Sequence, residues 1–490
     1  MTPEAIAHEF DVIVIGAGAV GENAADRVIK GGLTAALVEA ELVGGECSYW
    51  ACMPSKALLR PGTALHGAQS VQGSEQAVTG TLDAAAVLKR RDEFTSNWQD
   101  DGQVKWVEDT GIDLFRGHAS ITSPGHVEVA ANDGGTQHLR ARHAVVIATG
   151  SHPSLPPIHG LEGLEVWGTR EATSAKEVPQ SLAVLGGGVS GTELAQAFAR
   201  LGAQVTLVAR GALLGSYPEE ASKLVEAGLR ADGVDVRLHT NTERVEQNSN
   251  GSFTLTLAGG ATVTAEKLLV STGRHPAVEG LGLENLGITS DDGKPLTLET
   301  DSSGAVKAVP AGDGGNAGQP WLYAVGDAAG KVLLTHQGKY EARATGAAIV
   351  ARAQGTLNGN PADWSKQAQT ANQHAVPQIV FTDPEIAAVG RTKEQAQSDG
   401  FNTSTVELPI AVAGSSLHSD NYQGWAQLVI DEDRKVLLGA TFAGPDVAEL
   451  LHAATIAVVG EVPLDRLWHA VPSYPTISEV WLRLLEKYGI

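Results

Sequence analysis

The sequence predicts an α/β protein that contains one strand–turn–helix unit twice and ends in a smaller module of strands and a helix. Two buried strands each run directly into a glycine-rich turn and a helix, at residues 11–30 and 182–200. From residue 376 the pattern changes to alternating strand-like runs, followed by one more helical stretch. At 490 residues the chain is long enough for about three domains, each with its own core.

The first glycine turn is typical of a Rossmann-like dinucleotide-binding unit. Its glycines are Gly16, Gly18 and Gly21, and a buried strand precedes them. In such a turn the first glycine permits tight bending, the second lets the backbone approach a pyrophosphate, and the third allows close helix packing. The next predicted strand, residues 35–38, ends in Glu39. This carboxylate is placed to accept hydrogen bonds from the ribose hydroxyls of a dinucleotide.

The same unit recurs with Gly186, Gly188 and Gly191 in the glycine positions. When the spacing from Gly16 to Glu39 is counted again from Gly186, it leads to Ala209, and Arg210 follows. The acidic ribose ligand is missing and a cation stands beside its place, so this unit tolerates a ribose that carries a 2′-phosphate. The alternative is that Arg210 is an ordinary surface charge.

The two cysteines of the chain, Cys47 and Cys52, lie in one stretch that runs from Gly44 to Lys56. In a regular helix their side chains would point about 140° apart, so a bond between them needs a distorted turn. A structural disulfide across so short a loop removes little chain entropy, and a domain of this size needs no such bond. Two unrelated buried thiols are the other alternative. We favour a pair that cycles between disulfide and dithiol.

The stretch Gly-Gly-Glu-Cys-Ser-Tyr-Trp-Ala-Cys-Met-Pro-Ser-Lys resembles the Gly-Gly-x-Cys-x4-Cys-x-Pro-Ser-Lys signature of the pyridine nucleotide-disulfide oxidoreductases, the family of lipoamide dehydrogenase, glutathione reductase and mercuric reductase. One departure is Ala51, where the family usually has glycine. The resemblance implies an FAD-dependent NAD(P)H oxidoreductase with a redox-active disulfide, in which Cys52 lies against the flavin and Cys47 attacks the substrate. It assigns FAD to the first dinucleotide unit and NADPH to the second, with NADH as the alternative coenzyme.

The resemblance extends to further residues of the candidate site. Lys56 is similar to a lysine near the reactive flavin nitrogen, and Glu193 to the glutamate that pairs with it. Ordinary surface charges are the alternative for both. Asp327, in a Gly-Asp pair after a predicted strand, resembles the aspartate that binds the ribityl chain of FAD. Further cofactor-binding positions that the resemblance implies are Gly45, Thr149, Gly150 and Gly273.

The resemblance covers nearly the whole chain and implies three domains. A discontinuous FAD-binding domain spans residues 1–151 and 275–350, and an NAD(P)H-binding domain spans residues 152–274. Residues 368–490 resemble the family's α+β dimerisation domain, including the run Val-Phe-Thr-Asp-Pro that ends at Pro384. The implied assembly is a homodimer with active sites across the interface.

The C-terminal run departs from that of the disulfide-reducing members. Those members carry a His-Pro-Thr-x-x-Glu motif whose histidine shuttles protons to the dithiol, whereas here the run begins with Tyr474 and ends with Glu479. A phenol is a far weaker base than an imidazole at neutral pH. His469 is the alternative proton shuttle, but aligning it with the family's histidine loses the match of Glu479 and its neighbours.

Mercuric reductases also carry tyrosine at this position, and the stretch from Glu193 to Arg210 is most similar to theirs. They need an additional cysteine pair at the C-terminus to accept mercury, and this sequence has no cysteine besides Cys47 and Cys52. We therefore predict that the electron acceptor is a quinone or another non-thiol oxidant. The alternatives are a low-molecular-weight disulfide, of the lipoamide or glutathione type, and a metal ion.

Composition narrows the partners of the chain. Its formal net charge of -22 disfavours binding to nucleic acids and to anionic membrane surfaces. No apolar run has the length of a membrane span, and residues 1–10 contain no basic residue ahead of the first strand. We therefore expect a cytoplasmic protein that acts on a small-molecule oxidant, and we predict no metal site.

Overall fold

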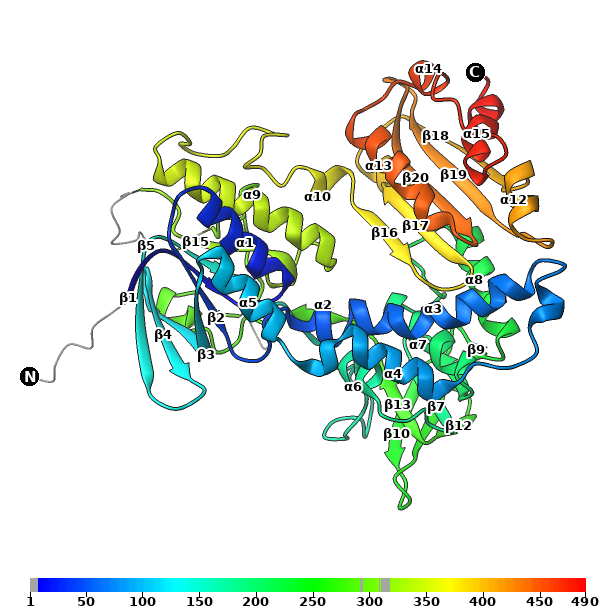
Figure 1. Ribbon diagram of the computed structural model, residues 1–490, viewed down its shortest axis with the longest axis horizontal. Helices are drawn as coiled ribbons and strands as arrows, with labels where there is room; N and C mark the ends of the chain where they lie inside the picture. Colours follow the sequence, from blue (N-terminus) through cyan, green and yellow to red (C-terminus); the bar gives the residue numbers. More distant parts are fainter. Residues whose placement is uncertain (1–7, 291–293, 308, 310–317) are drawn as a thin grey trace, which may run out of the picture. The chain divides into compact units, whose positions relative to one another are not determined.

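The structure is a computed structural model that describes residues 8–290, 294–307, 309 and 318–490. The chain forms two compact units, each assembled from three segments (Figure 1). The first unit consists of Met1–Cys52, Thr95–Ser154 and Arg274–Asn372, and the second of Met53–Phe94, Leu155–Gly273 and Gln373–Ile490. The predicted α/β class is confirmed, and the division into three domains stays a prediction.

The first unit is built on a six-stranded sheet with the order β1-β2-β3-β4-β5-β15, in which β1 also pairs with β5. Its strands are β1 (His8–Ile15), β2 (Ala35–Glu39), β3 (Asp113–Ser123), β4 (His126–Ala131), β5 (Thr136–Ile147) and β15 (Leu322–Ala324). Strands β1, β2, β5 and β15 pair in parallel, and β4 joins β3 and β5 antiparallel. Ile15 is aligned with Val38 and with Ile147. The carboxyl ends of β1, β2 and β5 therefore lie at one edge, where such sheets bind ligands.

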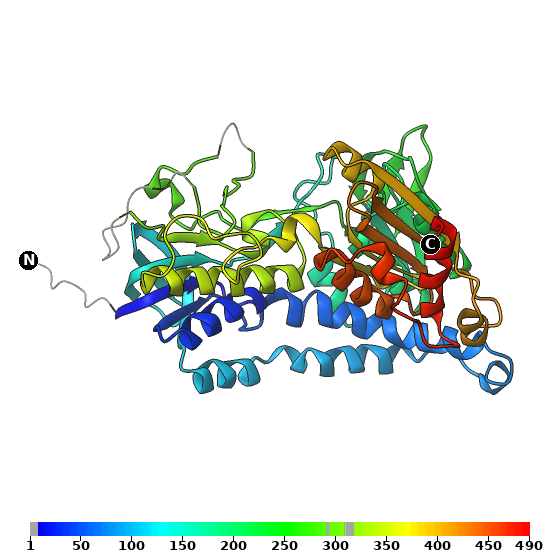
Figure 2. The same ribbon diagram turned by 90° about the horizontal axis from the view of Figure 1, so that it is seen from above.

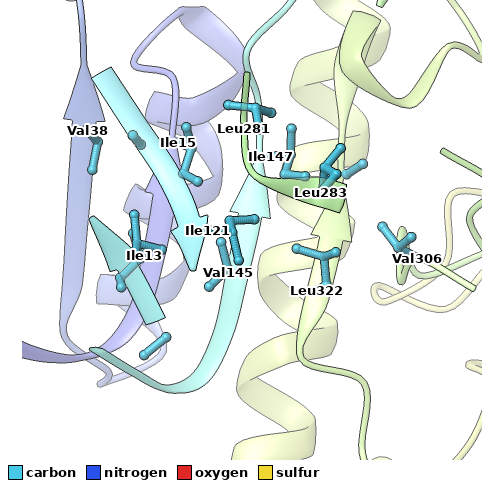
Figure 3. Close-up of a cluster of buried hydrophobic side chains, with 14 of the residues drawn as sticks. Ile13, Ile15, Val38, Ile121, Val145, Ile147, Leu281, Leu283, Val306 and Leu322 are labelled. Atoms are coloured by element: carbon cyan, nitrogen blue, oxygen red, sulfur yellow. The ribbon is translucent and has the colours of Figure 1, made fainter. Parts of the chain in front are cut away.

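Both faces of these parallel strands are covered, which explains why their sequences are almost continuously apolar. Alternate residues of a strand point to opposite faces of the sheet. Ile13 and Ile15 pack with Val145, Ile147 and Leu322 in the cluster that Figure 3 shows. The residues between them join a second buried cluster that includes side chains of α1 and α9.

Two helices, α1 and α9, lie side by side over the sheet of the first unit (Figures 1 and 2). Besides the sheet, the remaining elements of this unit are shorter than these two helices. The bounds are α1 (Ala19–Lys30), α2 (Gly45–Tyr49), α5 (Asp101–Thr110), α9 (Thr335–Ala353), α10 (Ala371–His374), η2 (Ser96–Trp98), η3 (Leu283–Leu286), η4 (Gly326–Ala329), β6 (Ser151–Pro153) and β14 (Arg274–Pro276).

The second unit contains a parallel four-stranded sheet with the order β13-β7-β8-β9 and an antiparallel sheet β10-β11-β12. The strands are β7 (Ser181–Leu185), β8 (Gln204–Val208), β9 (Asp235–Arg237), β10 (Thr242–Gln247), β11 (Phe253–Leu257), β12 (Thr262–Ala265) and β13 (Lys267–Val270). The helices in this part are α3 (Cys52–Gln69), α4 (Ala84–Phe94), α6 (Thr169–Ser174), α7 (Val189–Arg200), α8 (Glu219–Ala231) and η1 (Glu75–Ala77).

The same unit ends in a five-stranded antiparallel sheet with the order β16-β17-β20-β19-β18. Helix α13 packs on one face, and α8 contacts β17 and β20 through the other, so every residue of β20 is buried. The elements are β16 (Pro377–Val380), β17 (Glu385–Gly390), β18 (Thr403–Pro409), β19 (Trp425–Asp431), β20 (Val436–Gly444), α11 (Lys393–Ser398), α12 (Ala413–His418), η5 (Val447–Leu450), α13 (Leu451–Val459), α14 (Leu464–Leu467), η6 (Ile477–Glu479) and α15 (Val480–Tyr488). Among the residues described, no helix is both long enough and apolar enough for a bilayer.

Candidate active site

The first glycine turn leaves backbone N–H groups available at the start of α1. Gly16 has a φ of 99°, and a Cβ on it would lie 2.5 Å from the carbonyl oxygen of Ala148, so no side chain fits. Gly18 is the N-cap of α1, and no side chain caps this helix. The first-turn N–H groups and the positive end of the helix dipole are therefore available to the oxygens of a diphosphate.

Glu39 lies at the end of β2, beside this turn. Its Oε2 accepts the N–H of Ala17 at 2.7 Å, and its Oε1 accepts the N–H of Glu41 at 2.7 Å. Burial raises the pKa of Glu39, and the two backbone hydrogen bonds oppose that rise. Each carboxylate oxygen keeps a second lone pair. The carboxylate is thus fixed where it can also accept ribose hydroxyls.

The segment with the two cysteines is attached to the first glycine turn. The N–H of Gly44 donates to the carbonyl oxygen of Ala17 at 2.8 Å. Gly45 approaches the turn so closely that a Cβ on it would lie 2.7 Å from the Cα of Gly18. A glycine is required here for this close approach. The turn that suits a dinucleotide and the segment with the cysteines are therefore held in a fixed relation within the first unit.

The helix is interrupted between the cysteines, as their spacing requires. Helix α2 ends at Tyr49, Trp50 leaves the helical region with a φ of -137°, and α3 begins at Cys52. Both cysteines are free thiols in this structure. Two causes raise the pKa of Cys47. The larger is the side-chain hydrogen bond that it shares with Cys52, and the second is burial. Of two thiols joined in this way only one ionises readily, because a second charge would lie beside the first.

Thr335 contacts Cys52, although sequence reasoning did not include it in the site. Its Oγ1 lies 3.2 Å from the Sγ of Cys52. Thr335 is the first residue of α9, so the sulfur lies at the positive end of that helix, which stabilises negative charge. The only signal for this residue was its place a few positions after Asp327.

A brace of hydrogen bonds holds the chain on both sides of Cys47, and it too was missed by sequence reasoning. The indole N–H of Trp98 donates to the carbonyl oxygen of Tyr49 at 3.1 Å. The Tyr49 hydroxyl donates to the carbonyl oxygen of Val43 at 3.0 Å, and the N–H of Val43 donates to Asp100 Oδ2 at 2.8 Å. All three residues of η2 have positive φ, an uncommon conformation that places Trp98 for this contact.

Asp327 lies in η4, directly after β15, at the same sheet edge as the first glycine turn. The Ser151 hydroxyl donates to Asp327 Oδ2 at 2.5 Å, and the Nε of Arg274 donates to Ser151 Oγ at 2.7 Å. The Arg274 guanidinium also donates to Glu46 Oε2 at 2.6 Å. This chain of contacts connects Asp327 with the residue that precedes Cys47.

Two other predicted cofactor positions, Thr149 and Gly150, follow β5 at this edge. The Thr149 hydroxyl donates to the carbonyl oxygen of Ala277 at 2.6 Å, and the N–H of Ala277 donates to the carbonyl oxygen of Gly150 at 3.0 Å. The Thr149 hydroxyl is therefore engaged within the protein.

Glu341, which sequence reasoning did not select, accepts the N–H of Gly326 at 2.7 Å, and burial raises its pKa to about 6.

The glycine turn at residues 186–191 has the same geometry as the turn at residues 16–21. Gly186 has a φ of 121°, and a Cβ on it would lie 2.2 Å from the carbonyl oxygen of Ser271. Gly188 is the N-cap of α7, again without a side-chain cap, and a Cβ on Gly191 would lie 2.7 Å from the Gly186 carbonyl oxygen. This turn also suits a diphosphate. Gly273 has a φ of 137° and lies just after β13, the strand that pairs with β7.

The structure brings Lys56 and Glu193 together within the second unit. The Lys56 Nζ lies 2.7 Å from Glu193 Oε2, and the lysine side chain is 35% exposed while the glutamate is 3% exposed. Glu193 Oε1 accepts the N–H of Phe381 at 2.9 Å, and the Lys56 Nζ lies 4.8 Å from the centre of the Phe381 ring. The buried carboxylate thus has a partner for each oxygen, as a buried charge requires.

Among the described residues, no hydrogen bond joins Tyr474 and Glu479. The Tyr474 side chain is exposed, at 77% of its reference area. Glu479 is buried, and its Oε1 accepts a hydrogen bond from Arg483 at 2.7 Å. His469 is exposed, and within the described part of the chain its ring makes no hydrogen bond or ion pair. One oxygen of this carboxylate is thus bound to an arginine, and the other, Oε2, is buried and has no hydrogen-bond partner among the described residues.

Comparison with known families decides the identity of this fold. The model of the pyridine nucleotide-disulphide oxidoreductases matches residues 10–355, and the model of the family's dimerisation domain matches residues 376–484. The chain belongs to this family. Pyridine nucleotide-disulphide oxidoreductases are FAD-dependent enzymes that use NAD(P)H, so the predicted class of enzyme and its cofactors are confirmed.

Individual relatives match the chain over almost its whole length. Dihydrolipoyl dehydrogenase 2 of Haloarcula marismortui is 31% identical over 475 residues, which cover 96% of this chain and 94% of that protein. A mercuric reductase of Staphylococcus aureus is 30% identical over 476 residues, covering 96% and 81%. The HOCl-induced flavoprotein disulfide reductase RclA from Escherichia coli, solved as a Cu(II) complex, has the same fold. Its TM-score is 0.79 at 24% identity, with coverage of 98% and 99%.

Proposed function

We propose that the chain is an NADPH-dependent FAD oxidoreductase that uses Cys47 and Cys52 as a redox pair and reduces a quinone or another non-thiol oxidant. The first glycine turn, with Glu39, holds FAD, and the second, with Arg210, holds NADPH. When bound, the two cofactors supply a hydride donor and an electron carrier that delivers two electrons to the disulfide or to an acceptor. We place the enzyme in the cytoplasm, because a reducing compartment suits a cysteine pair that cycles between disulfide and dithiol.

The observation that carries the acceptor is Tyr474 in the place of the family's histidine. Reduction of a disulfide expels a thiolate that must be protonated, which a nearby imidazole does well. A phenol keeps its proton at neutral pH, and one oxygen of Glu479, the residue that would orient an imidazole, is bound to Arg483. A quinone takes two electrons and collects its two protons from water. The residues present therefore suit a quinone better than a disulfide.

We also propose that the enzyme acts as a homodimer with active sites across the interface. The matched dimerisation domain supports this arrangement. Its second support is a set of large apolar side chains that are exposed in that region, since isolated chains rarely leave so many uncovered. They are Ile456, Val459, Trp468, Val471 and Tyr474.

The proposal is tested with the FAD-loaded enzyme under anaerobic conditions, with NADPH as the donor and a panel of acceptors. The panel contains a benzoquinone, menadione, glutathione disulfide, lipoamide and Hg(II), and Cys47→Ser is measured beside the wild type. We expect kcat/KM for a quinone to exceed that for either disulfide by about a hundredfold or more. Faster turnover with a disulfide or with Hg(II) than with any quinone would refute the proposed acceptor.

A further inference from the structure

Helix α9 turns one row of side chains toward the segment with the two cysteines and toward α1. Thr335, Lys339 and Arg343 are spaced four residues apart, so they lie along one side of the helix. The Oγ1 of Thr335 lies 3.2 Å from the Sγ of Cys52, and Arg343 donates to Asn23 Oδ1 on α1 at 3.3 Å. Lys339 lies between these two contacts.

Close packing fixes the level at which Lys339 meets α1. A Cβ on Gly338, the preceding residue, would lie 2.7 Å from the Cγ2 of Val20, so the two helices touch there. The start of α1 is also attached to the segment with the two cysteines, through the close approach of Gly45 to Gly18. Lys339 is therefore held beside the first turn of α1 and beside that segment.

The Lys339 ammonium has no partner of its own. The side chain is half-buried, and within the described part of the chain it makes no hydrogen bond or ion pair. The nearby carboxylate of Glu22, on α1, has a buried Oε1 that also lacks a hydrogen-bond partner among the described residues. Burial raises the pKa of Glu22 to about 7, and the Lys339 ammonium opposes that rise. The two groups thus interact through their charges without forming an ion pair.

Two other carboxylates near the segment with the two cysteines are already satisfied. Glu46 Oε2 lies 2.6 Å from the Nη2 of Arg274, and both oxygens of Glu39 accept backbone N–H groups. Neither of them competes strongly for Lys339. The ammonium is therefore free to act on a further negative charge in its neighbourhood.

Reduction of the cysteine pair creates such a charge. When the disulfide accepts two electrons and one proton from the reduced flavin, which returns to FAD, the S–S bond breaks and leaves one thiol and one thiolate. The start of α9 favours the charge on Cys52, and the hydrogen bond shared with Cys52 raises the pKa of Cys47. The Lys339 ammonium lowers the pKa of Cys47 and so favours the charge there.

We propose that Lys339 is a positioning residue for the charge of the reduced pair: its ammonium draws that charge from Cys52 toward Cys47, so that Cys47 reacts as a thiolate. This inference rests on the proposed redox role of the two cysteines. Lys339 acts through its charge and neither takes nor gives a proton, so it does not replace the missing imidazole. Glu22 limits the effect, because its carboxylate competes for the same ammonium.

The test measures which sulfur is alkylated. Oxidised, FAD-loaded enzyme is reduced anaerobically with one equivalent of NADPH or with dithiothreitol that is then removed, and it is treated with iodoacetamide between pH 6.5 and pH 9. Mass spectrometry gives the separate rates at Cys47 and Cys52. The wild type is compared with Lys339→Met, Lys339→Arg and Glu22→Gln. Arg343→Gln is the matched control, since it removes a cation one turn further along α9 that is already hydrogen-bonded.

We expect Lys339→Met to slow the alkylation of Cys47 by about fivefold at pH 7.5 without slowing that of Cys52, and to move the pH profile of Cys47 to higher pH. Lys339→Arg should behave like the wild type, because it keeps the charge. Glu22→Gln should accelerate the alkylation of Cys47 by about twofold, since it removes the competing carboxylate. Arg343→Gln should match the wild type.

The outcomes separate the role of Lys339 from the redox role of the cysteines. Enzyme whose thiols become reactive after dithiothreitol but not after NADPH would overturn the proposed redox pair. If both reductants expose the thiols and Lys339→Met keeps the wild-type rate and pH profile at Cys47, the role of Lys339 alone is overturned. Slowing by Lys339→Arg or by Arg343→Gln as large as that by Lys339→Met would also overturn it, because the effect would then not come from the charge at position 339.

Discussion

The segment of the two cysteines and the C-terminal run at residues 474–479 differ in how firmly the rest of the chain holds them. The cysteine segment is bonded to the first glycine turn through Gly44, to η2 through Tyr49, and to α9 through Cys52. In the C-terminal run Tyr474 is exposed and has no such bond among the described residues, while Glu479 is bound to Arg483.

This contrast separates two requirements of the family's chemistry. The groups that accept and hold electrons need fixed geometry, and here they have it. The groups that supply protons to a leaving thiolate need an imidazole with a carboxylate behind it, and here the phenol of Tyr474 stands in the place of the imidazole. An enzyme with this combination is suited to acceptors that take protons from water.

The largest expected effect comes from giving the C-terminal run an imidazole. Tyr474→His combined with Arg483→Gln should raise kcat for lipoamide or glutathione disulfide by about a hundredfold, because a positioned acid–base group contributes at least this much. Arg483→Gln removes the cation that competes with an imidazole for the Glu479 carboxylate, so Tyr474→His alone should gain only about tenfold. Steady-state assays with a quinone provide the control, where little change is expected. Equal gains with both kinds of acceptor would mean that the contrast between the two regions does not determine the substrate.

The second prediction examines the thiols of the cysteine segment. Because the contact with Cys52 raises the pKa of Cys47, Cys52→Ser should lower that pKa and increase the thiolate fraction at neutral pH. Alkylation of Cys47 by iodoacetamide at pH 7.5, followed by mass spectrometry of the reduced protein, should accelerate by about tenfold. Thr335→Val should act in the opposite direction, because the Thr335 hydroxyl lowers the pKa of Cys47. Identical rates in all three proteins would show that the two sulfurs do not interact.

The smallest expected effect concerns the brace around the cysteine segment. Trp98→Phe removes the indole donor to Tyr49 and should lower the free energy of unfolding in urea by about 1 kcal/mol. Trp481→Phe is the matched control, because the indole N–H of Trp481 is buried and has no hydrogen-bond partner among the described residues. A loss for Trp481→Phe as large as that for Trp98→Phe would contradict the view that the indole hydrogen bond of Trp98 braces the cysteine segment.

Local patterns predicted the parts of this molecule that depend on local physics. The buried strands, the glycines with positive φ at Gly16 and Gly186, and the helix break between the cysteines all follow from periodicity and backbone sterics. The ion pair of Lys56 and Glu193 was reached through resemblance alone, because no spacing rule connects two residues so far apart.

The missed contacts have two different reasons. The contacts of Trp98 with Tyr49 and of Thr335 with Cys52 depend on how distant segments fold together, which no local pattern encodes. The ion pair of Glu479 and Arg483 could have been predicted from the sequence, because residues four apart at the start of a helix are neighbours. It was missed because the glutamate was considered only as the partner of an imidazole.

The central claim, that the electron-holding half of the site is in place and the proton-supplying half is not, is tested most directly by the pH dependence of reoxidation. The FAD-loaded enzyme is reduced anaerobically with one equivalent of NADPH and mixed with lipoamide or with a quinone in a stopped-flow instrument, between pH 6 and pH 9. The account predicts that reoxidation by lipoamide is slow at neutral pH and accelerates as the pH rises, because no imidazole takes the proton of the Cys47 thiol, whose pKa is raised, whereas reoxidation by the quinone is fast and nearly independent of pH. Rapid reoxidation by lipoamide with no dependence on pH across this range would contradict it.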